Sequence, residues 1–271
     1  MMTDDLSRIA AALERLAPSP GERPELRPAP AYLWRGDRLE EARHFVPLPL
    51  DLLTGIDAQK AALLENARRL ARGHAAHDVL LWGAKGTGKS ALVKSVVGAV
   101  QGEGSDLALV DVAVDRLDTL PALFAQVEEA SGAFILFIDD IGFEAGGPET
   151  RTLRSLLEGG AEARPSNARL HVTSNRRHIV ARNIAEQDSA INPRDVIDDR
   201  LALADRFGLT LGFHAMEQDT YLAIVERYTA TYDLAFDAQD ALQWATQRGA
   251  RSGRVAWHYV TELAGRAGRG L

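Results

Sequence analysis

The sequence predicts a three-layer α/β fold, in which a parallel five-stranded sheet is covered by helices on both faces and followed by a helical C-terminal unit. Two observations predict it. Between residues 79 and 213, short apolar runs alternate with stretches of helical periodicity, and from Glu217 onward only helical periodicity remains. Continuous apolar strands separated by helices are typical of a parallel sheet that is buried on both faces.

Three regions follow from this pattern, covering residues 1–45, 46–215 and 216–271. In the first, Leu6, Ile9, Leu13 and Leu16 have helical spacing, and five prolines between residues 18 and 30 then indicate an extended linker. That helix either packs on the core or docks a partner, and the pattern leaves both open.

The second region, residues 46–215, contains the alternating elements. The expected strands are 79–82, 107–112, 134–138, 169–173 and 209–213, and the helices between them are 88–100, 121–130 and about 149–157. The third region, residues 216–271, carries three apolar helical stripes, and the first of these includes Tyr221, Ile224 and Tyr228.

The composition excludes several classes of protein. The chain of 271 residues contains no cysteine, which rules out disulfides, thiolate zinc sites and iron–sulfur clusters. No run approaches the ~18 apolar residues that span a bilayer, and the acidic start is unlike a secretory signal, so we expect a cytoplasmic protein. A net charge of −7 disfavours a surface that binds nucleic acid throughout, although it allows a local basic patch.

Residues 83–90 read GAKGTGKS, a full match to the phosphate-binding pattern G-x-x-x-x-G-K-[ST]. Glycines let the backbone direct its N–H groups at phosphate oxygens, and the following helix adds its positive N-terminal end. Lys89 can reach the β- and γ-phosphates, and the Ser90 hydroxyl can bind Mg²⁺. An incidental glycine-rich turn is disfavoured because a strand leads into the loop and a helix leads out. The expected nucleotide-binding residues of this segment are Gly83, Ala84, Lys85, Gly86, Thr87, Gly88, Lys89, Ser90 and Ala91.

A second signal is the apolar run 134–138, which ends in Asp139 and Asp140. Asp139 is placed to hold Mg²⁺ through a water molecule, and Asp140 is the candidate base or water-positioning group for attack on the γ-phosphate. Acids often end a strand merely because the strand has reached solvent. The phosphate loop about fifty residues upstream makes the catalytic interpretation the stronger one.

These motifs resemble the AAA+ superfamily. More closely, the chain is similar to a bacterial family of AAA+-type ATPases catalogued as domain of unknown function 815. The likeness covers roughly residues 45–266. It depends on LTGIDAQKAALLENARRL, LLWGAKGTGKSALVK, FILFIDDIGFEAG, LLEGGAEARPSNARLHVTSNRRH, LADRFGLTLGF and RSGRVAWHYV. The resemblance implies a P-loop ATPase whose C-terminal helices form a lid over the nucleotide.

The resemblance also implies roles for residues outside the two motifs. Asn175 matches the sensor-1 position that orients the attacking water, with a plain turn asparagine as the alternative. Arg206 resembles an arginine finger that acts on a neighbouring subunit, and Arg200 is a second candidate; a surface ion pair is the alternative for both. Arg254 matches the sensor-2 arginine of the lid. Gly55 and Ile56 resemble the segment that lines the adenine pocket.

One position departs from the commonest AAA+ pattern, because Asp140 stands where Glu is usual. The shorter side chain moves the carboxylate back by about one C–C bond, which could slow hydrolysis. Helicase-loader ATPases also carry Asp-Asp here, so the change does not imply inactivity. Glu144 is a possible substitute base, although a loop carboxylate is more often only solvated.

The expected function is therefore ATP hydrolysis with Mg²⁺, driving a conformational change in a homo-oligomer or in a protein client that the sequence does not name. The first rival is a slow-hydrolysing, nucleotide-gated switch or loader. The second is a DNA-associated ATPase that contacts nucleic acid through residues 176–178, which the net charge does not favour. His74 and His77 lack a third ligand at sensible spacing, so we do not expect a metal there.

Overall fold

The computed structural model describes residues 26, 28–142, 147–159, 164–175 and 203–271. The strands are β1 (Ala31–Trp34), β2 (Leu39–Glu41), β3 (Val79–Gly83), β4 (Leu107–Asp111), β5 (Ala133–Ile138), β6 (Ala168–Ser174) and β7 (Leu209–Phe213). The α-helices are α2 (Asp57–Ala71), α3 (Lys89–Gly102), α4 (Leu120–Glu129), α5 (Pro148–Glu158), α7 (Gln218–Thr231), α8 (Ala238–Gln247) and α9 (Gly253–Arg266). Two 3₁₀ turns are η1 (Leu50–Leu52) and η2 (Val114–Thr119).

The strands form one seven-stranded sheet in the order β2-β1-β4-β5-β6-β3-β7. All neighbouring pairs are parallel except β1 with β2. The predicted five-stranded parallel sheet is present as β4-β5-β6-β3-β7, but the strand count was too low. The two additional strands come from residues 31–41, inside the segment for which only a helix and a linker were expected. They are four and three residues long, which is too short for a periodic pattern to be visible.

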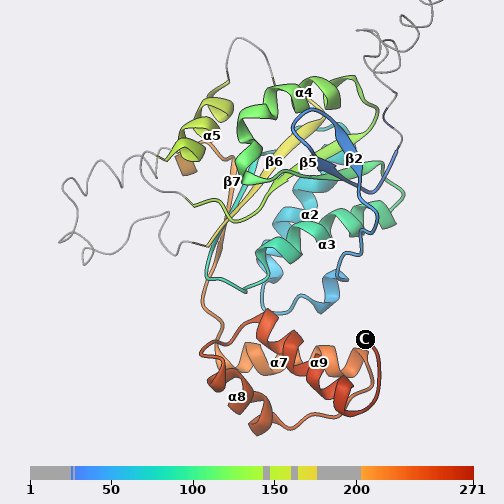
Figure 1. The fold of residues 1–271 in the computed structure, drawn as a ribbon, viewed down its shortest axis with the longest axis vertical. Coiled ribbons are helices and arrows are strands. Elements are labelled where there is room, and N and C mark those ends of the chain that lie inside the picture. The colour runs from blue at the N-terminus through green and yellow to red at the C-terminus, as the bar shows by residue number, and fades with distance from the viewer. Residues whose placement is uncertain (1–25, 27, 143–146, 160–163, 176–202) are drawn as a thin grey trace, which may run out of the picture.

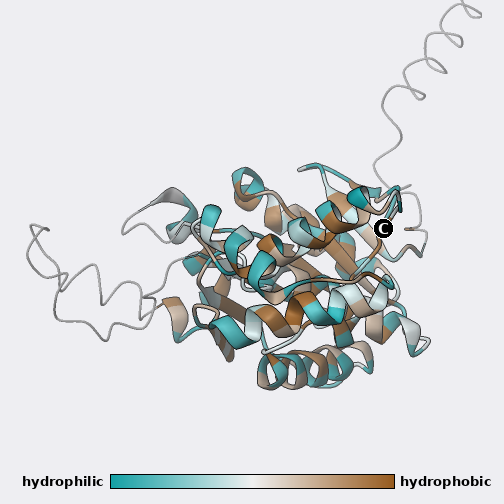
Figure 2. Ribbon diagram, turned by 90° about the horizontal axis from the view of Figure 1, so that it is seen from below, coloured by the Kyte–Doolittle hydropathy of each residue, from teal (hydrophilic) through white to brown (hydrophobic). Residues whose placement is uncertain are grey.

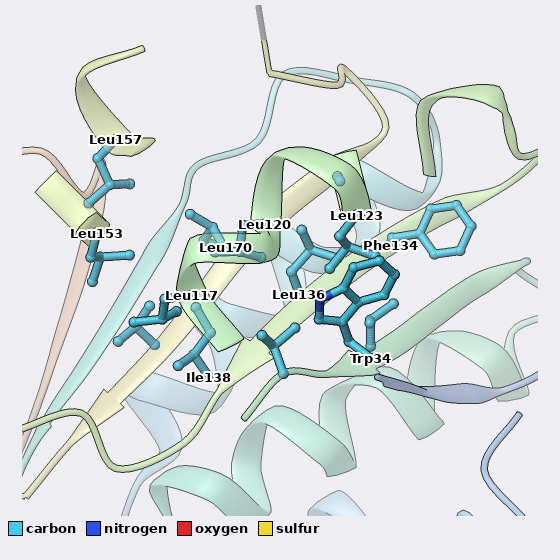
Figure 3. Packing of buried hydrophobic residues seen from close by; sticks show 14 of the residues in the cluster. Trp34, Leu117, Leu120, Leu123, Phe134, Leu136, Ile138, Leu153, Leu157 and Leu170 are labelled. Carbon is cyan, nitrogen blue, oxygen red and sulfur yellow. The ribbon is translucent and has the colours of Figure 1, made fainter. Parts of the chain in front are cut away.

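Helices cover both faces of the sheet, as expected for three layers (Figure 1). Successive side chains of a strand point to opposite faces, and β5 shows this clearly. Phe134, Leu136 and Ile138 pack with α4 and α5 on one face, whereas Ile135 and Phe137 pack with α2 and α3 on the other. The first of these two cores is drawn in Figure 3, where Leu120 and Leu123 of α4 lie over the sheet near Trp34.

The helices α7, α8 and α9 form a third cluster with its own buried side chains, which include Tyr221, Tyr259 and Val260. This cluster lies at one end of the molecule in Figure 1, and in Figure 2 hydrophilic and hydrophobic segments alternate along the ribbons of the helices. Ser252 caps α9 by accepting a hydrogen bond from the backbone N–H of Val255 (3.2 Å). Residues that follow β3, β5 and β6 line a pocket together with residues of α7 and α9, so the carboxyl ends of these three strands lie toward the helical unit.

Candidate nucleotide-binding site

The phosphate loop lies where β3 ends and α3 begins, as the motif predicts. Gly83 has φ +133°, and a Cβ there would lie only 1.9 Å from the carbonyl oxygen of Phe213 on β7. Gly88, the residue before α3, has φ +96° in the left-handed region. Side chains rarely adopt these conformations, so glycine is required at both positions. The loop is thus a tight turn whose following residues open a helix of 14 residues.

Lys89 is the central cation of the loop, and its side chain is 5% exposed. Its Nζ donates hydrogen bonds to the carbonyl oxygens of Gly83 (3.0 Å) and Ala84 (2.8 Å) and to Asn175 Oδ1 (2.9 Å). Burial lowers the pKa of Lys89, and the negative charges of Asp140 and Asp139 oppose that effect. A buried ammonium group whose pKa is shifted and which has two carboxylates nearby is typical of a functional site.

The two carboxylates that follow β5 diverge toward different partners. Asp139 Oδ1 accepts a hydrogen bond from the Ser90 hydroxyl (2.6 Å), which connects the end of β5 to α3. Asp140 has φ +59°, and its Oδ1 accepts a hydrogen bond from Asn175 Nδ2. The structure therefore brings together the predicted metal pair Ser90 and Asp139 and, separately, the predicted catalytic pair Asp140 and Asn175.

A pocket of about 500 Å³ opens between the sheet and the C-terminal helices. A volume of this size is ordinary for a small-molecule site. The predicted residues that line it are Ile56, Lys85, Gly86, Thr87, Gly88, Lys89, Ser90, Ala91, Asp139, Asp140, Asn175 and Arg254. Gly83, Ala84 and Gly55 do not line it. The carbonyl oxygens of Gly83 and Ala84 instead accept hydrogen bonds from Lys89, and Gly55 packs against Thr220 of α7.

Other lining residues were not predicted from the sequence: Leu48, Leu52, Leu53, Thr54, Met216, Ile224, Tyr228, Gly253 and Trp257. Most of them are apolar, and they come from residues 48–54 and from the segment that contains α7 and α9. The available signal was weak, because Tyr228 and Ile224 belong to an apolar stripe that also packs the helices together. Trp257 contacts Tyr228 edge-on at 5.4 Å between ring centroids, so it combines packing with a place in the pocket wall.

Arg254 reaches the pocket from the first turn of α9, and its side chain is exposed. Arg206 does not reach it. It lies just before β7, where its guanidinium forms an ion pair with Glu158 at the end of α5. The alternative finger Arg200, the substitute base Glu144 and the basic residues 176–178 lie outside the described residues.

The residues at the carboxylate end fit Mg²⁺ by their chemistry. This cation prefers oxygen ligands and usually takes only one or two from the protein, the rest coming from phosphates and water. The Ser90 hydroxyl and the Asp139 carboxylate are such donors. Across the described ranges, no group of three or more His, Asp or Glu side chains forms a metal site of its own. No helix of that part of the chain is long and apolar enough to cross a membrane.

Several solved structures share this fold at low sequence identity. The RuvB Holliday junction branch migration motor of Thermotoga maritima is 18% identical, with a TM-score of 0.54 over 82% of this chain and 67% of that one. A variant of the same RuvB protein is 19% identical, with a TM-score of 0.55 over the same shares. The ORC1 protein of Aeropyrum pernix, in complex with DNA, is 18% identical, with a TM-score of 0.53 over 81% of this chain and 63% of its own. Identities this low show the fold alone.

The chain belongs to the family described as Protein of unknown function (DUF815), which matches residues 27–267. The family predicted from the sequence motifs is confirmed. No curated protein matches this sequence.

Proposed function

We propose that this protein binds ATP with Mg²⁺ and hydrolyses it as an AAA+-type ATPase, using the reaction to change how the C-terminal helices engage an oligomer or a client. The observation that supports this most directly is the shared pocket. It is lined by the phosphate loop, by both carboxylates after β5, by Asn175 and by Arg254 of α9. Residues 46–215 would act as the nucleotide-binding core and residues 216–271 as its lid.

Binding of the triphosphate would depend on three features of the loop. Its backbone N–H groups and the N-terminus of α3 offer positive partial charge, and Lys89 adds a full charge. Lys89 already lies between its loop carbonyls and Asn175, so little side-chain entropy remains to be lost on binding. The apolar side chains that line the pocket, among them Ile56, Tyr228 and Trp257, suit the flat faces of a purine base.

Ser90 and Asp139 would hold the magnesium ion. The bound ion would supply neutralisation of negative charge on the phosphate oxygens. The Ser90 hydroxyl already directs its proton to Asp139, which leaves the lone pairs of its oxygen free to face a cation. The two residues thus fit the role without rearrangement of their mutual hydrogen bond.

Hydrolysis requires a water molecule to attack the γ-phosphorus while the bond to the β-phosphate oxygen breaks, giving ADP and phosphate. Asp140 would accept the proton of that water or orient it, and Asn175 would fix the direction of the Asp140 carboxylate. Arg254 would contact the phosphates from the lid. Arg206 lies away from this pocket, so it would act only on a nucleotide held by a neighbouring subunit.

The experiment is ATP binding by Lys89→Ala, with Lys60→Ala as the matched control. Lys60 pairs with Asp57 at the start of α2 and does not line the pocket. Removing a buried charge that meets another charge costs ~2–5 kcal/mol, so we expect affinity for ATP to fall by roughly 30-fold or more. Lys60→Ala should bind as the unmodified protein does. Equal affinity of all three proteins would refute the site.

A second candidate is a slow-hydrolysing, nucleotide-gated switch, and the engagement of Asp140 by Asn175 favours it. A short carboxylate that is already hydrogen-bonded has less freedom to activate water. Steady-state hydrolysis across a protein concentration series separates the two functions. Turnover that rises cooperatively indicates an assembling ATPase, whereas tight binding with negligible turnover at every concentration indicates the switch. Stimulation by DNA that weakens with salt would indicate a nucleic-acid partner, as the ORC1 likeness suggests.

A further inference from the structure

Thr173 is a buried hydroxyl next to the two carboxylates. It is the penultimate residue of β6 and is 1% exposed. Its Oγ1 lies 2.5 Å from Asp139 Oδ1 and 2.8 Å from the backbone nitrogen of Asp140. No motif in the sequence distinguishes this threonine from an ordinary strand residue. It does not line the pocket, so it acts only through its neighbours.

The direction of both hydrogen bonds is fixed by chemistry. The backbone N–H of Asp140 can only donate, so the Thr173 oxygen accepts from it. An ionised carboxylate can only accept, so the single hydroxyl proton of Thr173 points at Asp139. One side chain therefore joins the backbone of one carboxylate residue to the side chain of the other.

Thr173 also holds the chain just beyond β5. The last paired residues of β5 and β6 are Ile138 and Val172, and the backbone nitrogen of Ile141 then donates to the carbonyl oxygen of Thr173 (2.9 Å). Between these two attachments, Asp140 turns into the left-handed region with φ +59°. That conformation is uncommon for a residue with a side chain and persists where surrounding contacts enforce it.

This turn separates the two adjacent carboxylates. Asp139 Oδ1 receives the hydroxyls of Thr173 and Ser90, while Asp140 turns toward Asn175. Within the described part of the chain, Asp139 Oδ2 takes no hydrogen bond and remains available to a ligand. Charge-assisted hydrogen bonds of this kind fix a carboxylate strongly.

We propose that Thr173 is a positioning residue of this site: its hydroxyl sets the direction of the Asp139 carboxylate for magnesium and holds Asp140 in the turn that directs it to Asn175. The inference rests on the proposed function, because it assigns Thr173 a part in the same Mg-ATP site. Groups that orient a metal ligand typically account for about 10- to 100-fold in metal affinity or activity.

The test compares Thr173→Val with Thr173→Ser. Valine keeps the β-branched shape and removes the hydroxyl, whereas serine keeps the hydroxyl. For each protein, affinity for ATP is measured in EDTA and across a Mg²⁺ titration, together with turnover. We expect Thr173→Val to raise the Mg²⁺ concentration for half-maximal effect by roughly tenfold or more, with ATP affinity in EDTA changed less than about twofold. Thr173→Ser should restore the unmodified Mg²⁺ dependence.

Thr229→Val controls for the general cost of deleting a buried hydroxyl. Thr229 is 2% exposed on α7, where it donates to the carbonyl oxygens of Val225 and Glu226, away from the carboxylates. This variant should lose stability on heating without any change in Mg²⁺ dependence. If Thr173→Val folds poorly, Thr173→Cys gives a milder loss, because a thiol is a weak donor and acceptor.

Two results would overturn the inference. One is a Thr173→Val protein with unmodified Mg²⁺ dependence. The other is a Thr173→Ser protein as impaired as Thr173→Val, which would assign the effect to packing. Both are distinct from failure of the proposed function, which would appear as no ATP binding by the unmodified protein. The Mg²⁺ titration of binding also applies if turnover is negligible, so the switch alternative is tested equally.

Discussion

The backbone nitrogen of Gly253 donates a 3.0 Å hydrogen bond to the carbonyl oxygen of Gly86. This hydrogen bond joins the first residue of α9 to the middle of the phosphate loop, which lies 167 positions earlier in the chain. The contact is close, because a Cβ on Gly86 would lie 2.8 Å from the Cβ of Ser252. The loop and the C-terminal helices thus meet directly, through backbone as well as side chains.

Gly86→Ala should weaken nucleotide binding by displacing α9 from the loop. Gly104→Ala is its matched control, because Gly104 has a similar φ (+84° against +80°) but nothing within 4 Å of a new Cβ. In both variants, a side chain in the left-handed region lowers the free energy of unfolding by about 1–2 kcal/mol. Thermal unfolding would measure this loss. Only Gly86→Ala should also lower affinity for ATP. Equal losses of affinity in both variants would show that the contact with Ser252 is irrelevant.

Arg206→Ala should abolish turnover without weakening ATP binding. An arginine finger supplies roughly 1,000-fold or more in rate, and Arg206 does not line the pocket of its own subunit. The measurements are turnover per subunit across a concentration series and ATP affinity at one concentration. Arg269→Ala, which removes an exposed partner of Asp233, serves as the control. Turnover that is independent of concentration and unchanged in Arg206→Ala would contradict the role.

Glu158→Gln tests the ion pair that holds Arg206 in the isolated chain. To reach a neighbour's nucleotide, the guanidinium must leave Glu158, so loss of that negative charge should favour assembly. We expect half-maximal turnover at a lower protein concentration than for the unmodified protein. A shift to higher concentration would instead show that Glu158 orients Arg206 productively.

His171 should make the fold sensitive to acid. It is fully buried on β6, its ring nitrogens have no hydrogen-bond partner among the described residues, and burial lowers its pKa to about 3. In the unfolded chain the pKa is near 6.5, so between these values the unfolded state binds more protons than the folded one. The contribution of His171 to the free energy of unfolding is therefore greatest above pH 6.5 and falls by about 1.4 kcal/mol per pH unit between pH 6.5 and about pH 3.

His171→Leu removes the pH-dependent contribution of this histidine to the free energy of unfolding. Urea unfolding at pH 7.5 and pH 5 would measure the contribution. The unmodified protein should lose about 2 kcal/mol more than the variant between these two pH values. His74→Leu changes an exposed histidine and should leave the pH dependence unaltered. An identical loss in the His171→Leu protein would show that other groups govern its acid sensitivity.

Much of the candidate site was predictable because the loop and the two carboxylates are each local in sequence. The loop from Gly83 to Ser90 is contiguous, and Asp139 and Asp140 follow an unmistakable buried strand. The other residues that line the pocket could not be predicted in the same way. Leu48, Tyr228 and Trp257 meet only through folding, and each has a side chain whose pattern is explained equally well by core packing.

Two features of the structure could not be recognised from the sequence alone. The strands β1 and β2 are too short to show alternation, and β1 is recognisable only from its pairing with β2 and β4. Thr173 is a β-branched residue in a strand, where propensity alone accounts for its presence. Its role becomes visible only when the neighbouring strand places two carboxylates against it.

The pocket is lined by two parts of the chain, because residues before α2 and residues of α7 and α9 both contribute to it. Any molecule that binds there has free energy of interaction with both parts. By thermodynamic reciprocity, a partner that pulls α7–α9 away from the sheet must weaken the binding of that molecule by the same factor by which the molecule weakens the binding of the partner. A partner or a force that acts on the C-terminal helices would therefore change the affinity of the pocket for its ligand.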